Sequence, residues 1–170
     1  MSSSNLGTLF LVPTPLDHGC DLAAPPALSE VLPLSTIQRA AKLTHWVSEN
    51  AKSTRAFLKR VDAIAPLGTP LQALDIQVLP REAHKHGDHQ TQDLSAAKAL
   101  LAPVSRGHDV GLISEAGMPA IADPGSSVVR AAHAMGAPVK ALVGPISLML
   151  ALAASGLNGQ QFAFQGYLPQ

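Results

Sequence analysis

The sequence predicts an α/β fold with mainly parallel sheets, arranged as two domains. Short apolar runs alternate with helical patterns along all 170 residues, as strands joined by crossover helices do. Several apolar runs end abruptly in glycine, proline or polar residues, which is typical of buried strands that empty into loops. The hydrophobic share of 46% is large enough to build a buried core.

The first half of the chain is expected to contain three strands. The apolar run Thr8–Val12 is stopped by a Pro-Thr-Pro turn, so it is predicted to be a buried strand. A proline-rich stretch with one short helix at 27–31 follows, and Ser35 is expected to cap a helix over 36–42. The remaining elements predicted here are a strand at 44–48, a helix at 49–60 and a strand at 72–79.

Residues 81–93 are the most polar part of the chain and are expected to form an exposed loop. Three histidines in it, His84, His86 and His89, have a spacing that could place imidazoles on one face of an extended segment. Only Glu82 and Asp88 offer carboxylates beside them. A solvated loop is therefore preferred to a metal site, and contact with a substrate is the preferred role if the loop has one.

The strand predicted at 110–114 leads into the most informative segment of the chain. In the loop that ends at Gly125, two glycines allow close approach of a ligand and two prolines fix the shape. Ligands of open α/β sheets bind at the carboxyl ends of the strands, so this loop is predicted to line a ligand site. An ordinary strand-to-helix connection is the alternative. The other elements predicted in this half are helices at 94–101, 126–134 and 146–154 and strands at 139–143 and 162–167.

A boundary within the loop 118–125 divides the chain into an N-terminal domain, 1–117, and a C-terminal domain, 118–170. Only two helices and two strands are predicted after residue 118, which is a poor core for an independent domain. We therefore expect the second domain to be a partial, truncated α/β unit that completes a ligand cleft with the first.

Composition narrows the class of protein. The formal net charge is zero, so no overall basic surplus points to nucleic acid, although a local patch remains compatible with RNA. Cys20 is the only cysteine, which excludes a disulfide framework and a cysteine-based zinc site within one chain. Without a signal-like N-terminus or a long apolar segment, the chain is expected to be cytoplasmic and not membrane-bound.

Four segments occur in the order found in the tetrapyrrole methylase superfamily. They are the loop Ser114–Gly125, then Val143–Ser147, Ala153–Leu157 and Phe164–Pro169. The chain resembles most the branch that contains the ribosomal RNA small subunit methyltransferase I, and it looks like a divergent paralogue. Each motif alone is weak, but four in register are specific.

This resemblance implies a methyltransferase that uses S-adenosylmethionine (SAM), with the cofactor between two domains, a homodimer, and 2′-O-methylation of a ribose in ribosomal RNA. The side chains that resemblance places at the cofactor are Pro13, Ser114, Glu115, Ala116, Gly117, Pro119, Ile121, Pro145, Ile146, Ser147, Tyr167 and Leu168. No metal site is implied. A non-catalytic SAM-binding or scaffold protein with the same fold, a tetrapyrrole or small-molecule methylase, and an unrelated nucleotide-binding protein are the alternatives.

Glu49, which follows the strand at 44–48, is the predicted catalytic residue. The ribosomal methylases have an acidic residue, Asp, Thr and Arg in succession at this place, whereas here only Glu49 keeps its position and Thr54-Arg55 lie farther on. Its carboxylate could act as a general base on a hydroxyl. It could equally serve as a helix N-terminal carboxylate.

Three cations share one face of the predicted helix at 49–60. Lys52, Arg55 and Lys59 lie at positions i, i+3 and i+7. They could contact the phosphates of a nucleic acid. A plain solvated helix face is the alternative, and the neutral net charge slightly favours it.

Overall fold

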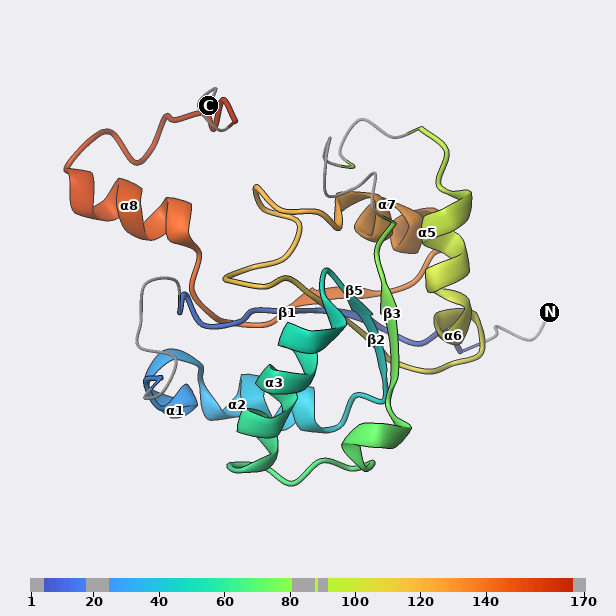
Figure 1. Cartoon of the computed structure of the whole chain (residues 1–170). Coiled ribbons are helices and arrows are strands. Elements are labelled where there is room, and N and C mark those ends of the chain that lie inside the picture. The colour runs from blue at the N-terminus through green and yellow to red at the C-terminus, as the bar shows by residue number, and fades with distance from the viewer. Residues whose placement is uncertain (1–4, 18–24, 81–87, 89–91, 167–170) are drawn as a thin grey trace.

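The computed structural model describes residues 5–17, 25–80, 88 and 92–166. In this part of the chain five parallel strands form one sheet in the order β3-β2-β4-β1-β5. The strands are β1 (Leu9–Val12), β2 (His45–Ser48), β3 (Asp75–Val78), β4 (Val110–Ile113) and β5 (Val139–Ala141). Helices cover both faces of this sheet (Figure 1), which confirms the predicted α/β class.

Strand β1, which lies between β4 and β5, supplies side chains to two separate cores. Leu9 and Leu11 belong to one buried cluster, and Phe10 and Val12 belong to the other. Successive side chains of a strand point to opposite faces of a sheet, so the two clusters lie on opposite faces. Burial on both sides explains why β1 and β4 are apolar without a polar alternation.

The core that contains Phe10 and Val12 lies under the N-terminal helices. They are α1 (Leu28–Val31), α2 (Leu34–Ala41) and α3 (Ala51–Asp62), with the short 3-10 helix η1 (Leu71–Ala73) at the sheet edge. Trp46 on β2 is the largest side chain in this core and is almost completely buried. Its indole N–H donates to the Leu43 carbonyl at 3.2 Å, which satisfies its polar atom.

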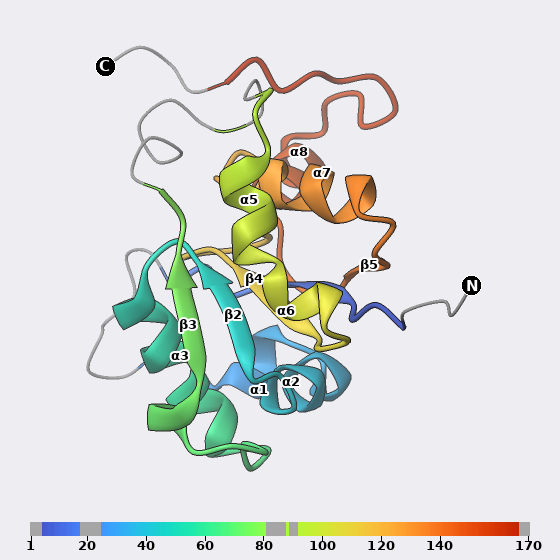
Figure 2. The same cartoon turned by 90° about the vertical axis from the view of Figure 1, so that its right-hand side faces the viewer.

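The core that contains Leu9 and Leu11 lies on the other face, under α5 (Ser95–Leu100), α6 (Ala102–Ser105) and α7 (Ser126–Ala134). Figure 2 shows α5 and α7 above the sheet and α1, α2 and α3 below it. Helix α7 begins and ends where the sequence predicts. None of the helices in the described ranges combines the length and hydropathy that a membrane span needs.

Helix α8 (Ser147–Ser155) projects from the body of the molecule. It has no buried residue, although it is apolar on all sides. Gly156 ends it in the left-handed conformation, with φ of 70°, as the glycine suggested. The predicted strand at 162–167 is wrong for its described part: residues 162–166 lie outside any strand and are exposed, because no open sheet edge is paired with them.

Several boundaries also differ from the sequence prediction, and two of them have a clear physical reason. Ser35 does not cap its helix, because α2 begins at Leu34, two residues before the predicted start, and Pro33 is its N-cap. The strand expected at 72–79 is shorter: Pro70, at φ of −53°, starts the turn η1, and extended pairing begins only at Asp75. Proline fixes φ near the helical value, which favours such a turn over a strand.

Strand β5 joins the sheet beside β1, with Leu9 opposite Val139. The chain between 118 and 141 therefore contributes a helix and a strand to the same layers as the N-terminal elements. A division of the chain at 117 and 118 remains a proposal. The pairing of β5 favours a boundary farther along, in the segment that leads from β5 to α8.

Gly111 in β4 is predicted to be intolerant of a side chain. A Cβ atom there would lie 2.6 Å from the Trp46 ring and 3.0 Å from Leu43. Since that ring is buried and hydrogen-bonded, Gly111→Ala should lower the free energy of unfolding by about 1–3 kcal/mol, measured by urea denaturation. Gly159→Ala, where a Cβ meets nothing within 4 Å, is the control and should change it little. Equal stability of the two variants would contradict this packing.

Candidate functional site

The sheet has a topological switch point between β1 and β4. These strands are neighbours in register, Leu9 opposite Val110 and Val12 opposite Ile113. The chain after β1 runs to the helices on one face, whereas the chain after β4 runs to α7 on the other. Loops that diverge in this way leave a crevice outside the carboxyl ends of the strands, where open α/β sheets bind ligands.

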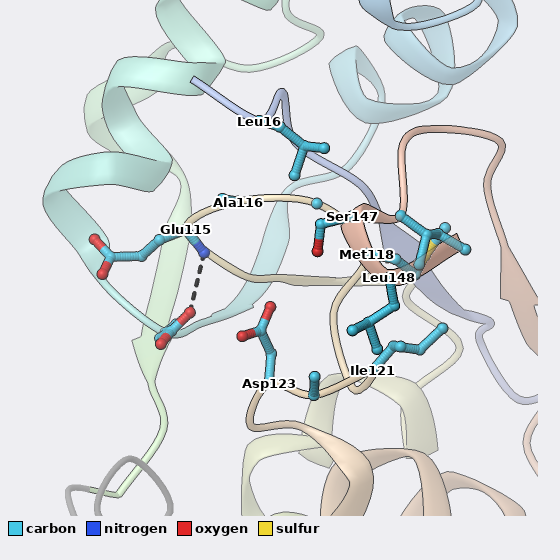
Figure 3. Close-up of a pocket in the computed structure, with 12 residues that line it drawn as sticks. Leu16, Glu115, Ala116, Met118, Ile121, Asp123, Ser147 and Leu148 are labelled. Atoms are coloured by element: carbon cyan, nitrogen blue, oxygen red, sulfur yellow. Dashed lines mark hydrogen bonds between the residues drawn. The ribbon is translucent and has the colours of Figure 1, made fainter. Parts of the chain in front are cut away.

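A cavity of about 380 Å³ occupies this position (Figure 3). Its volume lies in the range of small-molecule sites. Four of the five strands contribute to its wall through the loops that follow them. The lining residues are Leu16, Glu49, Glu115, Ala116, Gly117, Met118, Ile121, Ala122, Asp123, Ile146, Ser147 and Leu148.

The loops after β1 and β4 are joined by their main chains. The Thr14 N–H donates to the Gly117 carbonyl at 2.9 Å, and the Gly117 N–H donates to the Thr14 carbonyl at 3.1 Å. Gly117 has φ of 75°, a conformation that costs glycine little and other residues more. This bridge sets the floor of the cavity between Leu16 and Met118.

The segment after β5 reaches the cavity by passing close to the β1 loop. A Cβ at Gly144 would lie 2.2 Å from the Pro13 ring, so only glycine permits this approach. On the other side, the Thr36 hydroxyl donates to the Val143 carbonyl at 2.8 Å. These contacts bring the start of α8, with Ile146 and Ser147, to the cavity wall.

Glu49 joins the loop after β2 to the loop after β4. Its N–H donates to the Ile113 carbonyl at 3.2 Å, and its carboxylate accepts a hydrogen bond from the Glu115 N–H at 3.0 Å. The cap of α3 is a different residue, Asn50, whose side chain accepts from the Lys52 N–H at 2.9 Å. Glu49 is thus both a cavity-lining carboxylate and a positioning residue for the Glu115 main chain.

The cavity is acidic and apolar. Glu49, Glu115 and Asp123 line it, and no lysine, arginine or histidine is among the described lining residues. In Figure 3 the Asp123 carboxylate and the Ser147 hydroxyl face the middle of the labelled side chains, opposite the hydrophobic group around Ile121 and Leu148. Such a site favours a ligand with positive charge and an apolar body.

The 114–125 loop carries backbone strain. Ala120 and Ala122 have φ of 65° and 59°, which are unfavourable values for residues with a Cβ. Strain of this kind persists only where the surroundings hold it, and it is concentrated at ligand sites. Here the bridge to Thr14 holds one end of the loop.

Asp88 holds the other end. It is 4% exposed and accepts hydrogen bonds from the N–H groups of Gly125, Ser126 and Ser127 at 3.0–3.2 Å and from both serine hydroxyls. Burial raises the pKa of this carboxyl, but the bonds from Ser127, Ser126 and Gly125 outweigh burial and leave the pKa below its usual 3.8. Asp88 thereby caps α7.

Asp88 was expected in a solvated loop, and for this residue the prediction is wrong. Five donors at the start of α7 replace the water that the carboxylate loses on burial, and they stabilise its charge. Three of them are N–H groups of a helix N-terminus, which have no partner within the helix. The Gly-Ser-Ser sequence at the start of the helix was the available signal. His84, His86 and His89 lie outside the described residues, and no cluster of metal-ligating side chains occurs among those described.

No family model matches the chain, but named proteins do. It is 30% identical over 168 residues to the ribosomal RNA small subunit methyltransferase I of Escherichia coli O157:H7, which covers 99% of this chain and 49% of that protein. The corresponding protein of Xylella fastidiosa is 32% identical over 166 residues (98% and 50%), and that of Pseudomonas aeruginosa is 31% identical over 163 residues (96% and 48%).

The chain is a divergent relative of ribosomal RNA small subunit methyltransferase I. This finding confirms the resemblance to that branch of the tetrapyrrole methylases. The chain spans about half the length of the methyltransferases that it matches.

Seven predicted site residues line the cavity: six that the resemblance assigned to the cofactor, and Glu49, the predicted catalytic residue. They are Glu49, Glu115, Ala116, Gly117, Ile121, Ile146 and Ser147. Four others, Pro13, Ser114, Pro119 and Pro145, are absent from the lining. Pro13 supports Gly144, and the Ser114 hydroxyl lies 3.4 Å from the carbonyls of Ala116 and Gly117 in its own loop. Tyr167 and Leu168 lie outside the described residues.

The sequence analysis missed five lining residues, Leu16, Met118, Ala122, Asp123 and Leu148. Met118, Ala122 and Leu148 are direct neighbours of predicted positions, Asp123 lies two residues after Ile121, and Leu16 lies three residues after Pro13. Met118, Ala122 and Asp123 belong to a loop that turns sharply at Gly117, Ala120 and Ala122, and such turns carry no periodic signal. Met118 is 8% exposed and belongs to the buried core while also lining the cavity.

Replacement of Asp88 should test the anchor of the loop. Asp88→Asn removes the charge and places an amide N–H₂ among buried donors, so the free energy of unfolding should fall by about 2–3 kcal/mol at pH 7. Because the folded pKa is depressed, this contribution exists above the unfolded pKa of about 3.9 and is lost as pH falls through the folded pKa. Urea denaturation of both proteins from pH 7 to pH 2 measures it.

The matched control is Asp93→Asn, since Asp93 is exposed and bonds only the start of α5. Its effect should be the smaller of the two. A difference between wild type and Asp88→Asn that is absent at pH 7, or unchanged at acid pH, would refute the role of Asp88.

Proposed function

We propose that this chain binds SAM in the cavity at the β1–β4 switch point and acts as a SAM-dependent RNA methyltransferase. The observation that carries the proposal is the acidic and apolar cavity at the carboxyl ends of the strands. It lies in a chain that is related over its length to ribosomal RNA methyltransferases. A ribose 2′-hydroxyl of small subunit ribosomal RNA is the proposed acceptor. A homodimer and a cytoplasmic location belong to the same proposal.

The residues of the cavity fit this cofactor. The sulfonium and the amino group of SAM are positive, and three acidic residues line the cavity, of which Asp123 turns its carboxylate toward the other labelled side chains (Figure 3). The adenine needs an apolar slot, which Ile121, Ile146 and other aliphatic side chains can supply. The main chain of the 114–117 segment offers further donors and acceptors. Pro13, Ser114, Pro119 and Pro145 would support this wall from behind, and Tyr167 and Leu168 remain predicted adenine neighbours.

The cavity can assist methyl transfer mainly by alignment. SAM supplies an activated methyl group, which a nucleophile displaces in line. The protein's task is to hold the two reactants in a dry, fixed geometry. The bridge from Thr14 to Gly117 and the bond from Glu115 to Glu49 fix the loops that would hold them. A hydroxyl nucleophile also requires loss of a proton, for which the Glu49 carboxylate is the proposed acceptor.

The contact of Glu49 favours one rival function. Its carboxylate already accepts the Glu115 N–H, so a protein in which Glu49 only positions the loop would bind SAM without transferring its methyl group. A nucleotide-binding function has no such support. The polyphosphate of a nucleotide would meet acidic residues and no described cation in the cavity, which is unfavourable.

Neutralisation of Asp123 should discriminate between ligands with and without a sulfonium charge. Asp123→Asn should weaken the binding of SAM by about fivefold, which corresponds to about 1 kcal/mol for a partly screened charge. S-adenosylhomocysteine lacks the sulfonium charge and should lose less. Isothermal titration calorimetry gives both affinities, and Glu30→Gln on α1, an exposed acidic residue that does not line the cavity, is the control. Equal losses for both ligands would argue against this electrostatic recognition.

Transfer of radiolabelled methyl groups separates the proposed enzyme from its rival. Small subunit ribosomal RNA should become labelled by the wild type, and Glu49→Gln should lower the rate by about 100-fold or more if Glu49 takes the proton. Binding of SAM without labelling of RNA, protein extract or small molecules would instead support the alternative, a non-catalytic scaffold protein.

A further inference from the structure

The basic face of α3, formed by Lys52, Arg55 and Lys59, lies beside the cavity. Helix α3 starts two residues after the cavity-lining Glu49. It therefore begins at the carboxyl edge of the sheet and extends away from the site along the outer side, near the β3 edge (Figures 1 and 2). Anything held along α3 would be led to the mouth of the cavity.

The burial of α3 separates this face from the core. Thr54, Phe57, Leu58 and Val61 are buried against the sheet, whereas the three cations are exposed. Positions i, i+3 and i+7 lie within about 60° of one another around a helix, and the row rises by about 10 Å from Lys52 to Lys59. A row of that length presents its charges along a line, as a nucleic acid strand does.

The charges of this face are not used within the described part of the molecule. Ion pairs there are restricted to His45 with Asp75 and Arg60 with Asp17. Arg60, the fourth cation of α3, also donates to the Pro26 carbonyl and is a structural residue. Arg55 donates only a long bond, 3.4 Å, to the Ala51 carbonyl of its own helix.

We propose that Lys52, Arg55 and Lys59 bind the phosphate backbone of the RNA substrate and guide the acceptor nucleotide to the cavity. This inference rests on the proposed function for the existence of an RNA acceptor. It explains how a chain of zero net charge can attract a polyanion to a site whose own lining is acidic, because the attraction is local to α3. Phosphate contacts of this kind position a strand without reading its sequence.

The salt dependence of RNA binding measures these contacts. Each phosphate neutralised on a single strand contributes about 0.7 to the slope of log K against log salt, so loss of three contacts should reduce that slope by about 2. The test variant is Lys52→Gln/Arg55→Gln/Lys59→Gln. The probe is a fluorescein-labelled oligonucleotide of small subunit ribosomal RNA, titrated by anisotropy at several KCl concentrations. Lys59→Gln alone should lower the slope by about 0.7.

The matched control removes three exposed cations from other elements. It is Lys98→Gln/Arg106→Gln/Lys140→Gln, on α5, after α6 and on β5. The inference predicts a wild-type slope in this control. Equal losses in the two triple variants, absence of RNA binding by the wild type, or preferential binding of the basic face to phosphatidylserine vesicles would each overturn it.

Calorimetric titration of SAM keeps the two proposals apart. The α3 variant should bind SAM as the wild type does, because none of its three changes lines the cavity. Loss of the RNA slope with intact SAM binding supports the α3 surface. If the wild type binds RNA through α3 but does not bind SAM, the proposed cofactor site fails and the surface stands.

Discussion

The parallel pairing of β1 with β4 is the constraint on which the site depends. It places a strand from near the N-terminus beside one that starts about a hundred residues later, Val12 opposite Ile113. The two chains then leave the sheet toward opposite faces. Their loops would separate if the main chains of Thr14 and Gly117 were not hydrogen-bonded to each other. The cavity exists because the strands bring the loops together and this bridge keeps them there.

Other contacts adjust this crevice to one kind of ligand. The bond between Glu49 and the Glu115 N–H draws in the loop after β2, and the close contact of Gly144 with Pro13 draws in the segment after β5. Asp88 fixes the far end of the strained loop, at the start of α7. Negative charge is thus concentrated at the cavity, and unpaired positive charge is left on α3. A positive cofactor and a polyanionic acceptor would be directed to separate places.

Sequence reasoning predicted the fold well because burial on both faces leaves a clear pattern. The apolar runs that became β1 and β4 and the limits of α7 were all legible in the chain. The candidate site was legible in part, since the glycines and prolines of the 114–125 loop mark it. Asp88 and Asp123 were not. A buried carboxylate in a polar segment looks like a solvated one until its donors are known, and they come from residues nearly forty positions away. The sharp turns at Ala120 and Ala122 likewise have no sequence signature.

A crystal structure of the protein soaked with S-adenosylhomocysteine tests the central claim most directly. The account predicts ligand density between the 115–123 loop and the start of α8, with the sulfur on the side of the cavity that carries Asp123 and Glu49. Density bound elsewhere, or a crevice that is filled by the protein's own side chains when the ligand is present at saturating concentration, would contradict it.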